Sequence, residues 1–331
     1  MNAKRLQAKN VQKVRNQLVP TTIVTGFLGS GKTTLILHLL DDLLKLGVKP
    51  VYIKNEIGAA DVDGALVRGK HIQTKELLNG CICCTLVGPF QSAIDELLEV
   101  TDADRLIIEA SGAADPAAIA LMVSSHPRLL RDGVVSVVDV LNFEGYKDLS
   151  QTARNQTIFT DIIVFNKIED VSLDRKRQVV GYVRELNAHS PIIEAPNGRA
   201  NPAILLGLDG TELRKLLQHS PQATEDHAHN HTALHLQQDG IEVLKIATSQ
   251  VVVTDKTEQI IAALPNNVFR VKGFMVDAQG QLHAIQKVGA RVSVAQIDLS
   301  PMPDLELVLI GFHLSDSGAN LGATLIKQLA S

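Results

Sequence analysis

The amino-acid sequence predicts an α/β fold, with a mainly parallel β-sheet covered by helices, followed by a smaller α+β domain. From residue 20 to about 218, short β-branched runs alternate with longer amphipathic segments, which is typical of a parallel sheet with helices on both faces. A glycine-rich loop, Gly26-Phe-Leu-Gly-Ser-Gly-Lys-Thr33, lies between the first strand-like run and the first helical run. From Ile241 onward strand-like runs follow one another, and Asp277-Ala-Gln-Gly280 has the composition of a hairpin turn.

Nearly all predicted strands of the first domain are apolar throughout, as expected of strands buried on both faces of a sheet. Strands are predicted at 21–25, 51–54, 105–109, 134–138, 162–165 and 192–194, and helices at 35–46, 91–100, 174–186 and 211–218. In the second domain strands are predicted at 243–247, 251–253, 268–276, 282–286, 292–297 and 305–310, and helices at 256–264 and 321–330.

A length of 331 residues suggests roughly two domains of ~150 residues each. We predict a basic N-terminal tail over 1–19, a P-loop domain over 20–218, a histidine-rich linker over 219–238 and the α+β domain over 239–331. The tail has five Lys and Arg before residue 18 and no acid, so we interpret it as a frayed helix, with an organelle presequence as the alternative.

Composition excludes several classes of protein. The net charge of −4 provides no general basic field, so neither nucleic acid nor a membrane surface is expected as a partner. No apolar run approaches the ~18 residues of a spanning helix, and the N-terminus lacks a secretory signal. The three cysteines are crowded into four positions, which predicts reduced thiols and a cytoplasmic protein.

The glycine-rich loop has the spacing of a phosphate-binding P-loop. Gly26, Gly29 and Gly31, with Ser30 between the last two, allow the backbone to direct several N–H groups at one phosphate. The helix that follows adds the positive end of its dipole. The alternative interpretation is that this loop is only a strand-to-helix turn that binds no ligand.

The residues after these glycines suit a nucleoside triphosphate with magnesium. Lys32 is expected to reach the β- and γ-phosphates, and the Thr33 hydroxyl, followed by Thr34, to complete the ligand shell of an octahedral Mg²⁺. The expected ligand is therefore a magnesium-bound nucleotide.

Carboxylates follow other buried strands, where a P-loop protein needs groups to hold magnesium or to orient water. Glu109 ends one strand, and we assign it a catalytic role with Lys32 and with Asp63, which lies in a predicted switch loop over 55–64. For Asp115, before Pro116, we favour a helix N-cap.

The strand over 162–165 is followed by Asn166-Lys167-Ile-Glu169. A carboxylate there can accept two hydrogen bonds from the N1–H and 2-amino edge of guanine, which adenine does not offer, so GTP is the predicted nucleotide. The alternative for Glu169 is a helix N-terminal acid.

Cys81, Cys83 and Cys84 form a Cys-x-Cys-Cys motif. Two or three thiolates suit Zn²⁺ or Cu⁺ better than Mg²⁺, and Glu56, a histidine, water or a client's ligand could fill a remaining position. Packed structural cysteines or a redox sensor are the alternatives.

Five of the eleven histidines lie between residues 219 and 235. This tract is interpreted either as a linker that also binds metal weakly or as a solvated linker only. For the α+β domain that follows, substrate or partner contact and a purely structural lid both remain open.

Five motifs occur together in one order: Gly26-Phe-Leu-Gly-Ser-Gly-Lys-Thr-Thr34, Asn55-Glu-Ile-Gly58, Glu76-Leu-Leu-Asn-Gly-Cys-Ile-Cys-Cys84, Glu109-Ala-Ser-Gly-x-x-Asp-Pro116 and Asn166-Lys-x-Glu169. The chain resembles the CobW-type (cobalamin synthesis protein W-like) P-loop metallochaperone GTPases, relatives of the nickel-insertion GTPases of hydrogenase and urease maturation. The resemblance spans residue 20 to about 330. Its specific part is the Cys-x-Cys-Cys after Asn-Gly.

The resemblance implies a GTPase domain over 20–218 that hydrolyses Mg²⁺-bound GTP, and a CobW-type C-terminal domain. It also implies handling of zinc, or cobalt, for a metal-requiring client protein, and it is compatible with a nucleotide-dependent homodimer. Two departures matter: Ala59 replaces the last Glu of the family's usual Asn-Glu-Phe-Gly-Glu, and Glu169 replaces Asp. A metal sensor or storage protein with incidental GTPase activity is the alternative function, whereas Asn166-Lys167 and the thiols disfavour an ATP-dependent kinase.

Overall fold

The computed structural model describes residues 18–54, 73–76, 87–112, 114–146, 149–208, 241–249, 251–298, 302–314 and 321–330. The chain divides into two compact units, Met1–Ala200 and Asn201–Ser331. The predicted N-terminal tail up to residue 17, the predicted helix over 211–218 and the histidine-rich tract lie outside the described residues.

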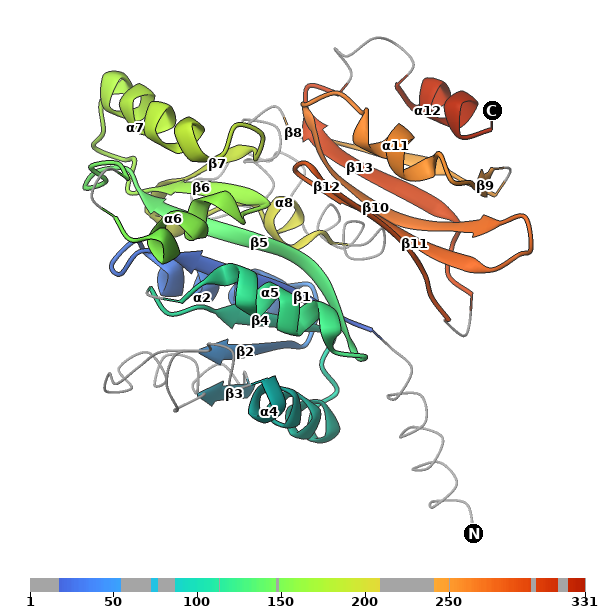
Figure 1. Ribbon diagram of the computed structural model, residues 1–331, viewed down its shortest axis with the longest axis horizontal. Coiled ribbons are helices and arrows are strands. Elements are labelled where there is room, and N and C mark those ends of the chain that lie inside the picture. The colour runs from blue at the N-terminus through green and yellow to red at the C-terminus, as the bar shows by residue number, and fades with distance from the viewer. Residues whose placement is uncertain are drawn as a thin grey trace, which may run out of the picture. The chain divides into compact units, whose positions relative to one another are not determined.

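A seven-stranded parallel sheet forms the centre of the first unit, in the order β3-β2-β4-β1-β5-β6-β7 (Figure 1). Its strands are β1 (Val19–Gly26), β2 (Pro50–Lys54), β3 (Gln73–Glu76), β4 (Arg105–Glu109), β5 (Leu129–Asp139), β6 (Ile162–Asn166) and β7 (Ile192–Ala195). All six predicted strands are confirmed. The short polar strand β3 was not predicted, because its sequence Gln-Thr-Lys-Glu has the composition of an edge strand and lacks the apolar run of the others.

Strand β5 begins at Leu129, five residues before its predicted start at 134. The early part contains Arg131 and Asp132, which do not resemble a buried strand. Asp132 is nevertheless fully buried, because it accepts hydrogen bonds from Arg105 (2.9 Å) and from the Thr22 hydroxyl (3.0 Å). One partner on the adjacent strand β1 and one on β4, the next strand beyond it, thus allow a charged residue to lie inside the sheet.

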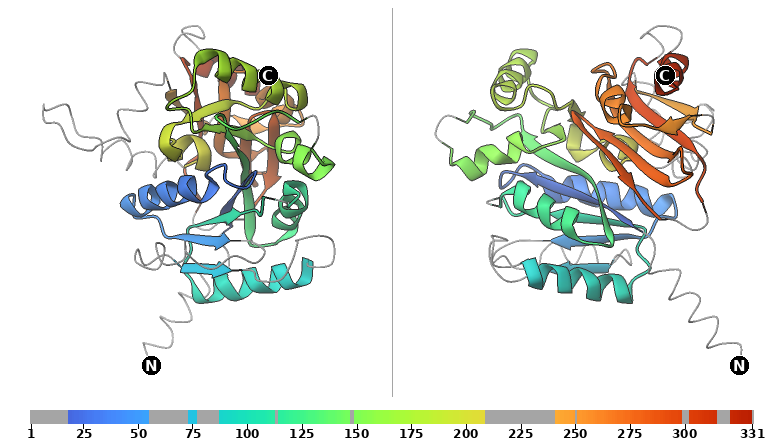
Figure 2. Two further views of the ribbon diagram at one scale, coloured as in Figure 1. Left: turned by 90° about the vertical axis from the view of Figure 1, so that its left-hand side faces the viewer. Right: turned by 45° about the vertical axis from the view of Figure 1, so that its right-hand side comes forward.

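Helices cover both faces of this sheet, as predicted. They are α2 (Lys32–Lys45), α4 (Val87–Val100), α5 (Pro116–Ser125), α6 (Gln151–Ile158) and α7 (Leu173–Leu186), with the 3₁₀ turn η1 (Pro196–Gly198) after β7. Helix α2 packs on one face through apolar residues at helical spacing, and α4 and α5 build the core on the opposite face (Figure 2). The predicted helices over 35–46, 91–100 and 174–186 are confirmed, and the Asp115 carboxylate caps α5 by accepting from the Ala117 N–H at 2.9 Å.

Parallel pairing brings the carboxyl ends of β1, β4, β5 and β6 to one edge of the sheet. The register aligns Val24 with Glu109 on one side of β1 and, across β5 and β6, Asp139 with Asn166. The loop after β1 is therefore flanked by side chains from the neighbouring strands, and this edge contains the candidate site.

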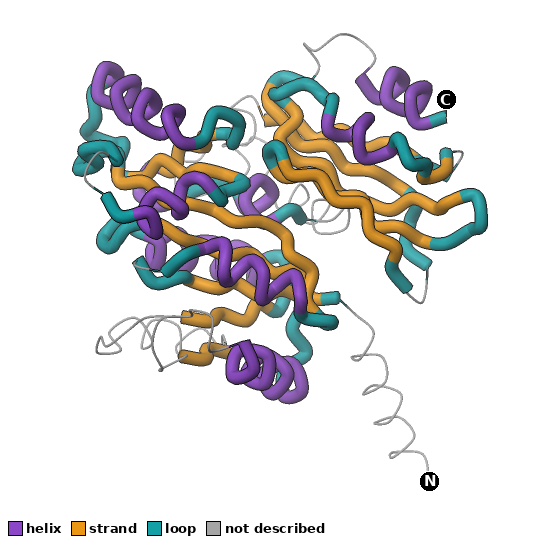
Figure 3. Tube along the Cα trace, viewed as in Figure 1, coloured by secondary structure: helices purple, strands orange, loops and turns teal. Residues whose placement is uncertain are grey.

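The second unit contains a six-stranded, mainly antiparallel sheet (Figure 3). Its elements are α8 (Pro202–Leu206), β8 (Ile241–Ala247), β9 (Val252–Val253), α11 (Thr257–Ala262), β10 (Val268–Asp277), β11 (Leu282–Val288), β12 (Arg291–Gln296), β13 (Glu306–Phe312) and α12 (Leu321–Leu329). Helices α11 and α12 contribute to the core on one face of this sheet. The predicted hairpin is confirmed, since the Gly280 N–H donates to the Asp277 carbonyl at 3.0 Å between β10 and β11.

Two cations of β10 hold the end of α8. Arg270 is 1% exposed and donates to the Ile204 carbonyl at 2.8 Å, and Lys272 donates to the Gly207 carbonyl at 2.9 Å. Positive charge at the C-terminal end of a helix pairs with carbonyls that lack helical partners. Residues 202–207, which sequence patterning placed in the first domain, are thus anchored to the second sheet.

Within the described residues, none of the helices combines the length and the hydrophobicity that a bilayer-spanning segment requires.

Candidate functional site

The glycine-rich loop connects β1 to α2 and adopts backbone angles that require glycine. Gly26, Gly29 and Gly31 have φ of 137°, 76° and 96°. A Cβ on Gly26 would lie 2.3 Å from the Val137 carbonyl oxygen, and one on Gly31 would lie 2.1 Å from Nδ2 of Asn166. Glycine is therefore needed both for the turn and for the close approach of neighbouring strands.

Helix α2 begins at Lys32 with its amino end directed into this loop. Gly31 is a left-handed N-cap, and none of the described side chains caps the helix. Thr33 and Thr34 lie in the first turn, which contains no acidic residue. An amino end of this kind, with its positive dipole end, favours an anion.

The Lys32 ammonium lies inside the loop. Its Nζ donates to the carbonyls of Gly26 (3.0 Å) and Phe27 (3.1 Å), and the residue is 7% exposed. Nearby, the Ser30 hydroxyl is buried and has no hydrogen-bond partner among the described residues. A phosphate is a stronger acceptor for an ammonium group than a carbonyl, and it would also supply a partner for a buried hydroxyl.

Glu109, at the end of β4, receives hydrogen bonds from two hydroxyl groups. Thr33 Oγ1 lies 2.9 Å from Oε1 and 3.2 Å from Oε2 of Glu109, and the Tyr52 hydroxyl donates to Oε2. The carboxyl group is buried, since Glu109 is 5% exposed. Glu109, which the sequence places at the end of a buried strand, therefore lies beside the first turn of α2, and its contact with Tyr52 was not anticipated.

Asn166 links the glycine-rich loop to the turn after β7. Its Nδ2 donates to the Ser30 carbonyl at 2.8 Å, and its Oδ1 accepts from the Gly198 N–H at 3.0 Å. The side chain is buried, with 4% of the residue exposed. Two loops that are far apart in the sequence are thereby held by one amide group.

The turn around Gly198 has further contacts that hold it against the site. The Glu169 carboxylate accepts from the Asn197 N–H, and the His38 Nδ1 of α2 lies 2.9 Å from the Gly198 carbonyl oxygen. Asn197 has a positive φ of 53°. Glu169 is exposed, so its carboxylate lies at the surface beside Asn166 and Lys167. The Pro196-Asn-Gly198 sequence after a short strand was a turn signal that could have pointed to this loop.

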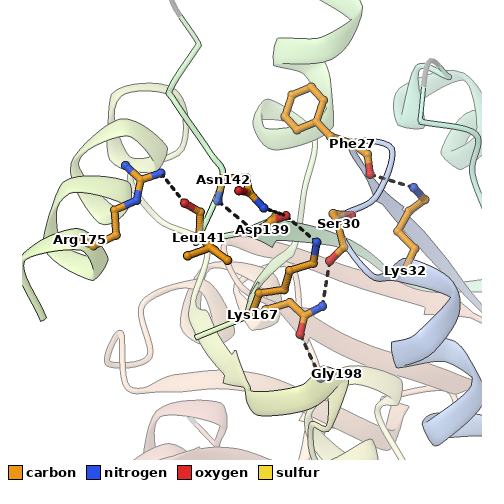
Figure 4. A network of polar contacts seen from close by, with 10 residues as sticks. Phe27, Ser30, Lys32, Asp139, Leu141, Asn142, Lys167, Arg175 and Gly198 are labelled. Atoms are coloured by element: carbon orange, nitrogen blue, oxygen red, sulfur yellow. Dashed lines mark hydrogen bonds and ion pairs between the residues drawn. The ribbon is translucent and has the colours of Figure 1, made fainter. Parts of the chain in front are cut away.

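Lys167 forms an ion pair with Asp139, at the end of β5 (Figure 4). The Nζ–Oδ2 distance is 2.7 Å, and Asn142 donates to Asp139 from its side chain (2.9 Å) and its backbone (3.1 Å). Partial burial raises the pKa of the Asp139 carboxyl, but the hydrogen bonds from Lys167 and Asn142 outweigh this effect, and the pKa lies below its usual value. Asp139 therefore stays ionised and restrains Lys167.

A cavity of about 260 Å³ lies beside the glycine-rich loop and Asp139 of this ion pair. It is lined by Phe27, Leu28, Asp139, Asn142, Phe143, Glu144, Gly145 and Leu149. Arg175 of α7 supports its wall by donating to the carbonyls of Val140 and Phe143. Lys32, Thr33 and Glu109 do not line this cavity, which distinguishes it from the phosphate side of the loop.

The remaining predicted site residues, Asp63, Glu56, Cys81, Cys83 and Cys84, lie outside the described residues. Within the described part of the chain, no cluster of three or more His, Cys, Asp or Glu side chains could hold a metal ion. The thiol site and the predicted switch loop therefore remain predictions from the sequence.

Comparison with known proteins identifies two family domains. A model described as "CobW/HypB/UreG, nucleotide-binding domain" matches residues 20–194, and one described as "Cobalamin synthesis protein cobW C-terminal domain" matches residues 241–327. Together they cover the two sheets apart from Val19, the first residue of β1, and Ala195, the last residue of β7.

Curated relatives match along much of the chain. The protein named zinc chaperone CobW from Sinorhizobium sp is 31% identical over an alignment of 346 positions, covering 91% of this chain and 95% of the relative. Zinc chaperone YjiA from Escherichia coli K12 is 34% identical over 206 residues, 60% of this chain and 64% of the relative. Zinc-regulated GTPase metalloprotein activator 1 from Schizosaccharomyces pombe is 31% identical over 225 residues, 63% of this chain and 54% of the relative. The matches to the last two span less than two thirds of those proteins, whereas the match to CobW is nearly complete.

The nucleotide-binding model covers more than half of the chain and includes the glycine-rich loop, Glu109 and Asn166, and a second model covers the antiparallel sheet. The chain therefore belongs to the CobW/HypB/UreG family, as a member with a CobW-type C-terminal domain.

Proposed function

We propose that this protein is a GTPase that couples the hydrolysis of GTP to the delivery of zinc to a client protein. The observation that carries the nucleotide assignment is the Asn166 bridge between the Ser30 carbonyl and the Gly198 N–H. Phosphate-binding and base-binding loops must be held at a fixed separation to take one nucleotide, and this amide holds the two loops together.

The phosphate side of the site is formed by Gly26, Gly29, Ser30 and Gly31, with Lys32 and the first turn of α2. Lys32 exchanges its loop carbonyls for the β- and γ-phosphate oxygens, where a positive charge stabilises the transferring phosphoryl group. The exposed Thr34 extends this first turn at the rim of the site.

The Thr33 hydroxyl and the Glu109 carboxylate suit Mg²⁺, because both are hard oxygen donors that lie 2.9 Å apart beside the phosphate loop. Bound there, Mg²⁺ neutralises negative charge on the phosphate oxygens. Thr33 would be a direct ligand, and Glu109 would accept hydrogen bonds from Thr33 and from water in the ligand shell.

The base side uses Asn166, Lys167 and Glu169. The Glu169 carboxylate lies at the surface of this loop and accepts the Asn197 N–H, which leaves acceptor capacity on two oxygens for the guanine edge. Guanine is favoured over adenine because only guanine presents two donors to such a carboxylate.

The metal is the cargo of the reaction. The Cys81, Cys83 and Cys84 thiolates, with Glu56, are the proposed binding site, and Asp63 is proposed to orient the attacking water. YjiA and CobW are named zinc chaperones, and a third relative is named a zinc-regulated GTPase metalloprotein activator. These names support zinc over cobalt and a protein as the client.

The crowded cysteines suit a reducing compartment, so we assign the protein to the cytoplasm. A nucleotide-dependent homodimer remains a prediction.

The test combines nucleotide turnover with zinc affinity. Phosphate release is measured with GTP and with ATP, and zinc affinity is measured against a competing chelator dye in the presence of GDP or a non-hydrolysable GTP analogue. We expect turnover of GTP and a zinc affinity that differs between the two nucleotide states by roughly 5- to 150-fold, the usual range of such couplings. Identical zinc affinities would remove the delivery mechanism and favour the sensor or storage alternative, and absence of turnover would remove the GTPase assignment.

A further inference from the structure

The carboxylate of Glu109 is held from two sides by hydroxyl groups of different origin. Thr33, on α2, belongs to the phosphate-binding sequence and lies 2.9 Å from Oε1. Tyr52, on β2, belongs to none of the motifs and donates to Oε2. The second contact therefore requires an explanation that the nucleotide motifs do not provide.

Strand register explains how Tyr52 reaches Glu109. In the parallel pair of β2 and β4, Tyr52 is opposite Ile107 and Lys54 is opposite Glu109. Alternation places Tyr52, Ile107 and Glu109 on the same face, which is the face that α2 covers. A long aromatic side chain can span the diagonal to a residue two positions along the neighbouring strand, and so its hydroxyl meets the carboxylate.

The environment makes this contact strong. Tyr52 is 2% exposed and Glu109 is 5% exposed, so water competes little for either group. A hydroxyl bonded to a carboxylate is a charge-assisted contact, roughly twice as strong as a neutral one. Because a carboxylate has about four acceptor positions, the tyrosine leaves Oε1 available to Thr33 and to further donors.

We propose that Tyr52 is a positioning residue for the magnesium-bound nucleotide: by holding Oε2 of Glu109, it directs Oε1 toward Thr33. This inference rests on the proposed nucleotide site. Tyr52 does not itself contact the nucleotide or the metal. Tyr52 acts by fixing the orientation of the Glu109 side chain. That side chain would otherwise have to be ordered when magnesium binds.

The experiment uses Tyr52→Phe, which removes one hydroxyl and keeps the ring. The matched control is Tyr146→Phe in the same unit, since Tyr146 is also buried (4% exposed) and its hydroxyl lies 2.6 Å from that of Thr157, outside the site. Binding of a fluorescent non-hydrolysable GTP analogue is titrated with Mg²⁺ in the full-length protein, and thermal unfolding is recorded for each variant. A double-mutant cycle adds Glu109→Gln with and without Tyr52→Phe.

We expect Tyr52→Phe to raise the Mg²⁺ concentration at half-maximal effect by about tenfold, the loss expected for one hydrogen bond to a charged group. Nucleotide binding in EDTA should be unchanged, and Tyr146→Phe should match the wild type. In the Glu109→Gln background the tyrosine substitution should have no further effect on the Mg²⁺ requirement.

An unchanged Mg²⁺ requirement in folded Tyr52→Phe would overturn the inference while leaving the nucleotide site intact. The same follows from an equal shift in Tyr146→Phe, or from a shift that persists in the Glu109→Gln background, because either would show a general effect on packing. Failure of the wild type to bind the analogue in a Mg²⁺-dependent way would instead overturn the proposed function, and this inference with it.

Discussion

Replacement of Asn166 by alanine tests whether one amide group holds the phosphate-side and base-side loops together. The substitution removes the 2.8 Å bond to the Ser30 carbonyl and the 3.0 Å bond from the Gly198 N–H, in a position that is 4% exposed. Loss of a partner for a buried polar group costs about 1–3 kcal/mol, so the free energy of unfolding should fall by about 2–6 kcal/mol for the two groups. The affinity for GTP should fall at least tenfold, about 1.4 kcal/mol, because the loops must be realigned before both ends of the nucleotide are bound.

Asn187→Ala provides the matched control. Asn187 is 8% exposed, donates to the carbonyls of Thr157 (2.8 Å) and Thr160 (3.2 Å), and accepts from the Ser190 N–H (2.9 Å), all away from the site. This variant should lose a similar amount of stability, measured by urea denaturation, and keep the wild-type Kd for a fluorescent GTP analogue at a temperature where all variants are folded. The reasoning would be refuted if Asn166→Ala bound the analogue like the wild type, or if Asn187→Ala lost affinity equally.

Four further predictions address the remaining groups. Lys32→Ala should abolish phosphate release from GTP with a normal circular dichroism spectrum, because the ammonium acts most strongly on the transferring phosphoryl group; full turnover would contradict the P-loop assignment. Glu169→Ala should reduce the ratio of GTP to ATP affinity, and a wild type that binds both equally would show that guanine is not recognised there. Burial lowers the pKa of His126 despite the Asp95 carboxylate 3.4 Å away, so the unfolded chain binds a proton more readily than the folded one. The free energy of unfolding should therefore decline as the pH falls below the ordinary histidine pKa of about 6.5, and His126→Gln should reduce this pH dependence of the urea midpoint. Cys83→Ser should weaken zinc binding and remove its dependence on GTP while GTP binding survives, as measured by chelator competition; unaltered zinc affinity would exclude Cys83 as a ligand.

The sequence alone determined the architecture of both units. Alternation of short apolar runs with amphipathic segments is a local property, and it predicted the strands around the glycine-rich loop and the helices on both faces. Successive strand-like runs and a turn signal likewise predicted the hairpin of the α+β domain. It also predicted the roles of Gly26, Gly31 and Asp115, because positive φ angles and helix caps depend on a few consecutive residues. Strand β3 could not be predicted in this way, since the pattern of a polar edge strand does not differ from that of a loop.

Only the tertiary structure decided which distant side chains meet at the edge of the sheet. The sequence separates Tyr52 from Glu109 by 57 positions and Ser30 from Asn166 by 136, and no local pattern encodes either pair. Strand order and register bring them together: β4 lies between β2 and β1, so a tyrosine of β2 faces the carboxylate of β4 beside α2. The burial of Asp132 has the same origin, because its two partners come from β1 and β4. The role of a charged or hydroxyl side chain within a strand cannot be predicted from the residues around it, because its partner lies on another strand. Which strand that is depends on the fold as a whole.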